Sequence, residues 1–151
     1  EQNTEPVLVE KRLQLEAANI AARALFWEDY LQTYPKSSYQ RDAEYLLKQY
    51  TYFLFRGSEQ SPISEDYRDR YSVETSHLET IIGLARGQKS KLSTQAQLFL
   101  EFLDMNPEQR QRALAADYRN RSSTEQILYY AQVTPPSQNY GKDCFKDAIC
   151  L

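Results

Sequence analysis

Few residues of this chain have side chains suited to general-base or metal chemistry. The sequence holds a single histidine, His77, and two cysteines, Cys144 and Cys150. An imidazole can serve as a general base, yet the neighbouring Glu74 and Glu79 form no obvious relay with His77. Two thiolates and one distant imidazole also fall short of the four ligands that zinc requires. We therefore expect no metal site, and we expect His77 to be a surface or helix-capping residue.

The carboxylates are plentiful and do not mark a catalytic pair. The densest groups are Glu28-Asp29, Glu65-Asp66 and Asp69, and most of these are expected on solvated helix faces. The chain has no Gly-rich phosphate loop, no GxSxG, no HExxH and no CxxC. We therefore expect a protein that is not an enzyme and that binds no cofactor.

The two cysteines lie close together in the polar end of the chain. On one helix, their spacing of six residues corresponds to about 240° around the axis, so the two thiols would point apart. A small closed loop suits the pair better. A disulfide between Cys144 and Cys150 would fix the tail and would indicate an oxidising compartment. The alternative is a pair of free thiols.

Four arginines are predicted to share one helix: Arg110, Arg112, Arg119 and Arg121. Guanidinium groups bind phosphate or the carboxylates of an acidic protein. Glu108 and Asp117 dilute this charge, so a solvated helix face is the other interpretation. The net charge of −3 and the pI of about 5.3 argue against binding to nucleic acid.

Length and composition describe the scaffold that must position these residues. A chain of 151 residues is expected to form one domain with its own core. With only 4 Gly and 6 Pro, tight turns are too few for a β-rich architecture. No apolar run reaches the ~18–20 residues that span a bilayer. The polar opening EQNTEPVLVE could remain after removal of a signal peptide and its membrane anchor, although a truncated chain would look the same.

Apolar residues recur at helical spacing on both sides of Pro35. The first row predicts one helix from about Val7 to Tyr34, and its members are Val9, Leu13, Ala17, Ile20, Ala24, Trp27, Leu31 and Tyr34. Pro35 ends this helix because the residue before a proline disfavours helical geometry. A second helix is expected to begin at Ser37 or Ser38, with Ser37 and Gln40 as a capping box, and to end at Gly57.

The later helices are expected to be shorter. Ser61-Pro62 or residues 64–66 could begin a third helix with Tyr67 and Tyr71 on one face. Further helix starts are predicted at three places: Ser93 or Thr94, Asn106-Pro107, and Ser122. The sequence thus predicts an all-α fold of six to seven helices, arranged as antiparallel hairpins, TPR-like or as a small irregular bundle. Residues 1–134 would form this domain, and residues 135–151 a polar tail.

Aromatic and small residues around the first turn follow a recognisable order: Trp27, Tyr30-Leu31, Tyr34-Pro35, Ser37, Tyr39, Ala43 and Tyr45-Leu46-Leu47. In this order the segment resembles the tetratricopeptide type of helical repeat. The resemblance is to the variant found in bacterial envelope proteins such as the outer-membrane β-barrel assembly lipoprotein and the Tol-Pal-associated coordinator. It departs from the pattern at Arg23 and Lys48, where small residues are expected, and no second copy follows. The resemblance implies stacked helical hairpins and binding to other proteins.

The richness in aromatic residues, 12 Tyr and 6 Phe, points to a binding surface. Tyrosine combines a large rigid contact area with a polar tip, and some rings of the second helix cannot all face one core. We expect a protein or peptide partner to bind in a groove of the first two helices, at Trp27, Tyr30, Tyr34, Tyr45, Tyr52 and Arg56. The expected location is the periplasm or the periplasmic face of the outer membrane. The alternative is a periplasmic inhibitor or immunity protein that blocks a secreted effector.

The cysteine pair gives a direct test of the compartment. Protein isolated from its native cells without reductant should weigh two hydrogen atoms less than the fully reduced chain, because Cys144 and Cys150 would be joined. Intact-mass spectrometry before and after reduction measures the difference. Two alkylatable thiols in that fresh material would contradict the bridge and the oxidising compartment.

Overall fold

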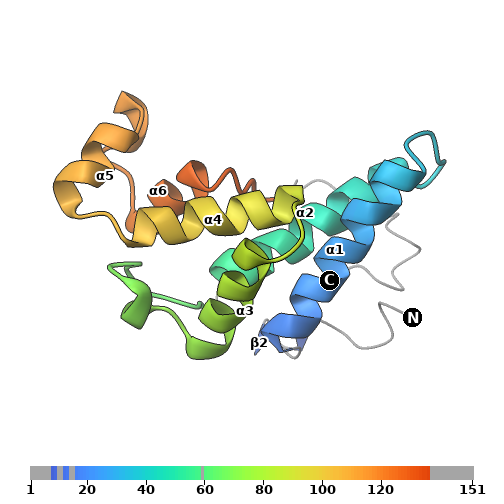
Figure 1. Ribbon diagram of the computed structural model, residues 1–151, viewed down its shortest axis with the longest axis horizontal. Coiled ribbons are helices and arrows are strands. Elements are labelled where there is room, and N and C mark those ends of the chain that lie inside the picture. The colour runs from blue at the N-terminus through green and yellow to red at the C-terminus, as the bar shows by residue number, and fades with distance from the viewer. Residues whose placement is uncertain (1–7, 10–11, 14–15, 59, 137–151) are drawn as a thin grey trace.

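The computed structural model describes residues 8–9, 12–13, 16–58 and 60–136, and these form the predicted all-α fold. Six α-helices make up the body (Figure 1): α1 (Ala17–Thr33), α2 (Gln40–Arg56), α3 (Thr75–Arg86), α4 (Lys91–Leu103), α5 (Pro107–Ala113) and α6 (Ser123–Tyr130). Two 3₁₀ turns, η1 (Arg70–Ser72) and η2 (Ala116–Tyr118), lie between them. The buried apolar side chains form one cluster that runs from Ala17 to Val133. The predicted disulfide, Cys144 with Cys150, lies outside the described residues.

The start of the predicted first helix is wrong. Leu8–Val9 (β1) and Arg12–Leu13 (β2) pair as two short antiparallel strands, and α1 begins only at Ala17. The apolar spacing before Ala17 fits a helix, but spacing measures only which face would be apolar. Alanine has the highest helix propensity, and α1 opens with alanines, whereas valine favours strands.

The first two helices form an antiparallel hairpin, as predicted (Figure 1). Their facing sides are buried and contribute Ile20, Ala24, Trp27, Ala43, Leu46 and Tyr50. The predicted capping box of Ser37 and Gln40 is absent. The Ser37 hydroxyl oxygen instead accepts the amide of Tyr39 at 3.0 Å and lies 2.7 Å from the hydroxyl of Tyr30, so it closes the turn and α2 begins at Gln40.

The carbonyl end of α2 is fully hydrogen-bonded. The last four carbonyl groups of a helix have no amide partner within the helix itself. Here all four accept hydrogen bonds: Phe53 from the Gly57 amide at 2.9 Å, Leu54 from His77 Nδ1 at 2.8 Å, Phe55 from the Tyr67 hydroxyl at 3.0 Å and Arg56 from the Ile63 amide at 3.2 Å. Side chains far along the sequence therefore fix the point where α2 ends.

Two of these partners correct the sequence interpretation. Of the two roles expected for His77, the surface position is wrong because the side chain is buried, and its ring nitrogen instead donates to the Leu54 carbonyl and so caps the end of α2. Residues 61–66 begin no helix, and Tyr67 and Tyr71 share no face, because Tyr67 is 1% exposed and Tyr71 is 96% exposed. Burial also raises the pKa of the Tyr67 phenol, which therefore stays a hydrogen-bond donor.

α3 and α4 form a second hairpin, and a carboxylate on α1 attaches this hairpin to the first one. Oε2 and Oε1 of Glu28 accept the amides of Lys91 and Leu92, both at 3.1 Å. Ser90 and Ser93 complete the start of α4 as a capping box, so the expected start at Ser93 or Thr94 is wrong by two or three residues. The first three amides of α4 are all satisfied, two of them from a residue more than sixty positions earlier.

The last two helices begin as the sequence predicted. Asn106 and Gln109 form a capping box before α5, and the Ser122 side chain accepts the amide of Glu125 at the start of α6. The four arginines do not share one helix, however, since α5 ends at Ala113. Asn106 as cap and Pro107 as first residue predicted where α5 begins. They did not predict that the helix ends after seven residues.

In the part of the chain that the structure describes, no helix combines the length and the apolar character needed to cross a bilayer.

Removal of the Glu28 carboxylate should destabilise the protein by about 2–3 kcal/mol, because two charge-assisted hydrogen bonds at a helix start would be lost from a buried site. The measurement is urea unfolding of the Glu28→Ala variant. Asp29→Ala is the matched control, since Asp29 is the next residue and is exposed. An equal effect of both substitutions would show that Glu28 does not hold α4 in place.

Candidate functional site

Three of the six predicted binding residues lie together along the C-terminal half of α1. The rings of Trp27 and Tyr30 meet edge to face with centroids 5.4 Å apart, and those of Tyr30 and Tyr34 follow at 5.2 Å. Trp27 is 7% exposed and belongs to the core, whereas Tyr34 is 56% exposed. Tyr30 and Tyr34 also line an open hollow at the turn, together with Pro35, Lys36 and others.

The other three predicted residues lie on α2, and two of them form a separate group. The guanidinium of Arg56 lies over the ring of Tyr52, 5.9 Å from its centroid. Tyr52 is twelve residues beyond the start of α2, roughly 18 Å along the helix axis from the turn that carries Tyr34. Tyr45 and Tyr52 are half-buried and pack against the core. That these six residues bind a partner stays a prediction.

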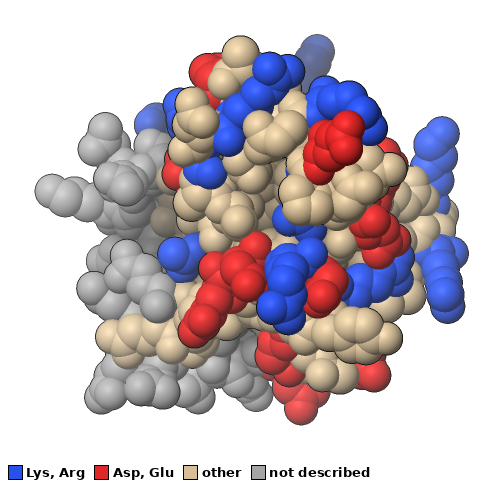
Figure 2. All heavy atoms as spheres, turned by 90° about the vertical axis from the view of Figure 1, so that its left-hand side faces the viewer, with Lys and Arg blue, Asp and Glu red and all other residues tan. Residues whose placement is uncertain are grey.

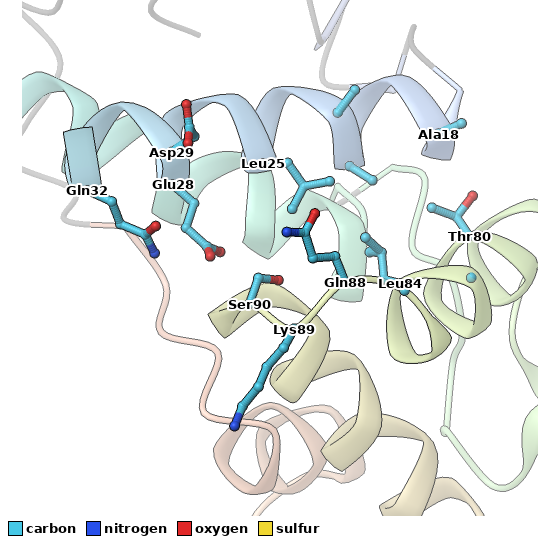
Figure 3. A pocket seen from close by; sticks show the side chains of 14 residues that line it. Ala18, Leu25, Glu28, Asp29, Gln32, Thr80, Leu84, Gln88, Lys89 and Ser90 are labelled. Atoms are coloured by element: carbon cyan, nitrogen blue, oxygen red, sulfur yellow. The ribbon is translucent and has the colours of Figure 1, made fainter. Parts of the chain in front are cut away.

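A second groove, of about 650 Å³, lies between α1 and the second half of α3 (Figure 3). None of the six residues predicted to bind a partner lines it. One wall is a row along α1, namely Ala18, Ala21, Ala22, Leu25, Glu28, Asp29 and Gln32. The other wall is Thr80, Gly83, Leu84 and Gly87 of α3 and its end, and residues 88–90 close it towards α4.

Small residues on both walls keep the groove open. Alanines on α1 and glycines on α3 leave the space that larger side chains would fill. At Gly83 the backbone needs no glycine, because an added Cβ would meet no atom within 4 Å and its φ is ordinary. A glycine in the middle of a helix costs about 1 kcal/mol relative to alanine, so this one weakens α3 without relieving any crowding.

Apolar side chains line the middle of the groove beside the Gln88 amide, and polar side chains lie at both ends, Thr80 at one and Glu28 and Gln32 at the other (Figure 3). Leu25 is 38% exposed and points across the groove towards Leu84 and Gln88 (Figure 3). The Glu28 carboxylate is turned to the start of α4, where it is already hydrogen-bonded, and Lys89 points away (Figure 3). The groove therefore offers apolar contact area with an amide at its edge, and no charge that faces inward.

Arg23 and Tyr50 are buried where α1 meets α2 and hydrogen-bond each other at 3.3 Å, and three further buried titratable side chains serve helix ends. Glu28 caps α4, and His77 and Tyr67 cap α2, so each is engaged by backbone groups. The described residues include no group of three His, Cys, Asp or Glu placed to hold a metal ion.

The four arginines singled out from the sequence mainly hold the backbone. Arg110 donates to the carbonyls of Tyr67 at 2.8 Å and Phe102 at 3.2 Å, and its guanidinium lies 4.7 Å from the centre of the Phe102 ring. Arg119 binds the carbonyl of Gln111 at 3.0 Å. Arg112 forms an exposed ion pair with Glu108, and Arg121 forms one with Glu125; in each pair the partners are four residues apart.

Comparison of the chain with protein-family models, curated proteins and solved structures gave no match. The interpretation of the surface therefore depends on its geometry. A sequence signal for the groove does exist, because Ala18, Ala22 and Leu25 form a second apolar row beside the core row of α1, and Gly83 and Gly87 repeat at the spacing of one turn.

Two glycines should respond in opposite ways to the same substitution. Gly83→Ala should raise the free energy of unfolding by about 0.5–1 kcal/mol, because the space is open. Gly57→Ala should lower it by at least about 2 kcal/mol, because φ is +79° and the Cβ would lie 2.3 Å from the Ser61 carbonyl oxygen. Urea unfolding of both variants measures the difference. A loss of stability in Gly83→Ala would mean that the groove is not open.

Proposed function

We propose that the protein is a non-enzymatic binding module of the bacterial cell envelope, and that it holds a helical segment of another protein in the groove between α1 and α3. The observation that carries this proposal is the open, apolar groove whose α3 wall contains an interior glycine with no role in the fold. A residue that lowers helix stability and leaves space at a surface is suited to the close approach of another chain.

The shape of the groove favours a helix as the bound element. Both walls are helices, and their small residues recur every three or four positions, which is the spacing at which ridges of another helix pack. A partner helix with an apolar stripe would cover Leu25 and Leu84, and its polar side would remain in water. The Gln32 and Gln88 amides are placed to bond polar groups at the edge.

The location in the envelope depends on the resemblance of residues 27–47 to envelope-type tetratricopeptide repeats and on the cysteine pair. The α1–α2 hairpin is compatible with such a repeat junction, since it places Tyr34-Pro35 at the turn and Ala43 at the buried helix contact. Fractionation of native cells, with a periplasmic and an outer-membrane marker, tests this part separately from binding.

A bulky residue in the groove should abolish partner binding without loss of stability. Gly83→Phe fills the groove, and Gln111→Phe adds the same ring to an exposed position of α5. Partner recovery from native envelope extract should fall at least about tenfold with Gly83→Phe and should be unchanged with Gln111→Phe.

A third variant separates the groove from the predicted aromatic site. Tyr34→Ala removes the most exposed of the six predicted residues, so it should leave the fold intact. Loss of the partner with Tyr34→Ala and its retention with Gly83→Phe would reject the groove and favour the aromatic residues at the turn.

A further inference from the structure

The connection between α2 and α3, residues 57–74, is unusually long for a compact domain and contains only the turn η1. Loops longer than about 12–15 residues without secondary structure are uncommon and often bind ligands or partners. All of this connection except residue 59 is described. Tyr71, near the end of this connection, is its most exposed large side chain.

The connection is held firmly from within. Ile63, Tyr67 and Val73 are buried, each no more than 5% exposed. The Ser64 hydroxyl accepts the amide of Tyr67 at 2.9 Å. The carbonyl of Ile63 accepts the amide of Glu74 at 2.7 Å, which closes residues 63–74 into a loop.

Neighbouring elements fix the loop from outside. Arg110 of α5 donates to the carbonyl of Tyr67 at 2.8 Å and to that of Arg68 at 3.1 Å. Arg70 binds Asp104 at the end of α4 through two parallel hydrogen bonds of 2.9 and 2.8 Å. A surface held in this way loses little conformational entropy when a partner binds.

Tyr71 is the exception within this ordered segment. It is 96% exposed, more than any other large apolar side chain among the described residues, while Arg70 beside it is fixed. Tyrosine is enriched among the residues that dominate binding energy, because a rigid ring fills a pocket and its hydroxyl finds a partner there.

The charge around Tyr71 indicates the kind of surface that would receive it. Arg68 pairs with Asp69 and Arg70 with Asp104, while the guanidinium of Arg110 also lies on this loop and attracts Asp66 and Asp69. Glu65 and Asp66 are exposed and have no ion pair among the described residues, so the unbalanced charge of the loop is negative. Figure 2 shows this end of the molecule, where acidic and basic side chains gather side by side. A basic rim complements such a surface.

We propose that Tyr71 is the anchor of a second interaction surface, which inserts into a pocket with a basic rim on another protein, a cleft of the kind that binds polyanions. This goes beyond the groove of α1 and α3 and would suit an inhibitor that blocks a phosphate- or polyanion-binding site. The loop serves only as a support, because the hydrogen bonds of Arg110 and Arg70 hold it so that the Tyr71 ring stays exposed.

The preorganisation is tested on the protein alone by hydrogen–deuterium exchange. The amides of residues 63–74 should exchange slowly in the wild-type protein. Arg110→Gln should speed exchange there at least about tenfold, whereas Arg112→Gln, which breaks only an exposed ion pair, should not. Fast exchange of this segment in the wild-type protein would remove the basis of the proposal.

The partner is tested with a photo-reactive amino acid at position 71 in extract of the cells that make the protein. A cross-linked protein should appear at position 71, and inorganic polyphosphate should compete it away because it fills the basic cleft. A second probe at position 68 allows Tyr71 itself to be changed. The cross-link from position 68 should fall at least about tenfold in Tyr71→Ala. It should persist in the control Tyr129→Ala, which removes another exposed ring.

The Gly83→Phe background separates this proposal from the proposed function, because the cross-link at position 71 should persist there. A cross-link that survives polyphosphate would overturn the basic pocket. Loss of recovery only in Gly83→Phe would place all binding in the groove, and absence of any product at position 71 would show that Tyr71 is no interface residue.

Discussion

The carboxylate of Glu28 is the contact on which the arrangement of the two hairpins depends. Its two oxygens accept the first two amides of α4, so a residue of the first hairpin serves as cap for the second. The partial positive charge at a helix start compensates for the burial of this carboxylate, which is 7% exposed. Because α3 precedes α4 by a short turn, fixing α4 also sets the distance between α1 and α3, and the groove follows from it.

The carbonyl end of α2 is also capped by residues from other elements, but here the side chains donate hydrogen bonds instead of accepting them. His77 from α3 and Tyr67 from the long connection donate to carbonyls that α2 cannot satisfy itself. In turn, Arg110 satisfies carbonyls of that connection and of the end of α4. Glu28, His77 and Arg110, which suggested chemistry from the sequence, are therefore occupied at helix ends, and the surface offers the groove and several exposed rings, of which Tyr71 is the most exposed.

Features of the fold that depend on neighbouring residues could be predicted. The spacing around Pro35 and the cap at Asn106 placed a hairpin and a helix start correctly, since each depends on groups within a few positions. The same reasoning failed at Ser37 and before Ala17. There the pattern allowed a helix, but the turn and a strand pair satisfied the backbone equally well.

The sequence by itself determined the all-α class, the α1–α2 hairpin and the richness in tyrosine, because helical spacing, proline and composition act locally. Only the tertiary structure decided which tyrosine is exposed. Tyr67 and Tyr71 lie four residues apart in similar sequence surroundings, yet Tyr67 is buried and Tyr71 is exposed. It also decided that small residues of α1 and α3 face one another. Both outcomes depend on where distant helix ends find hydrogen-bond partners, and no local pattern contains that information.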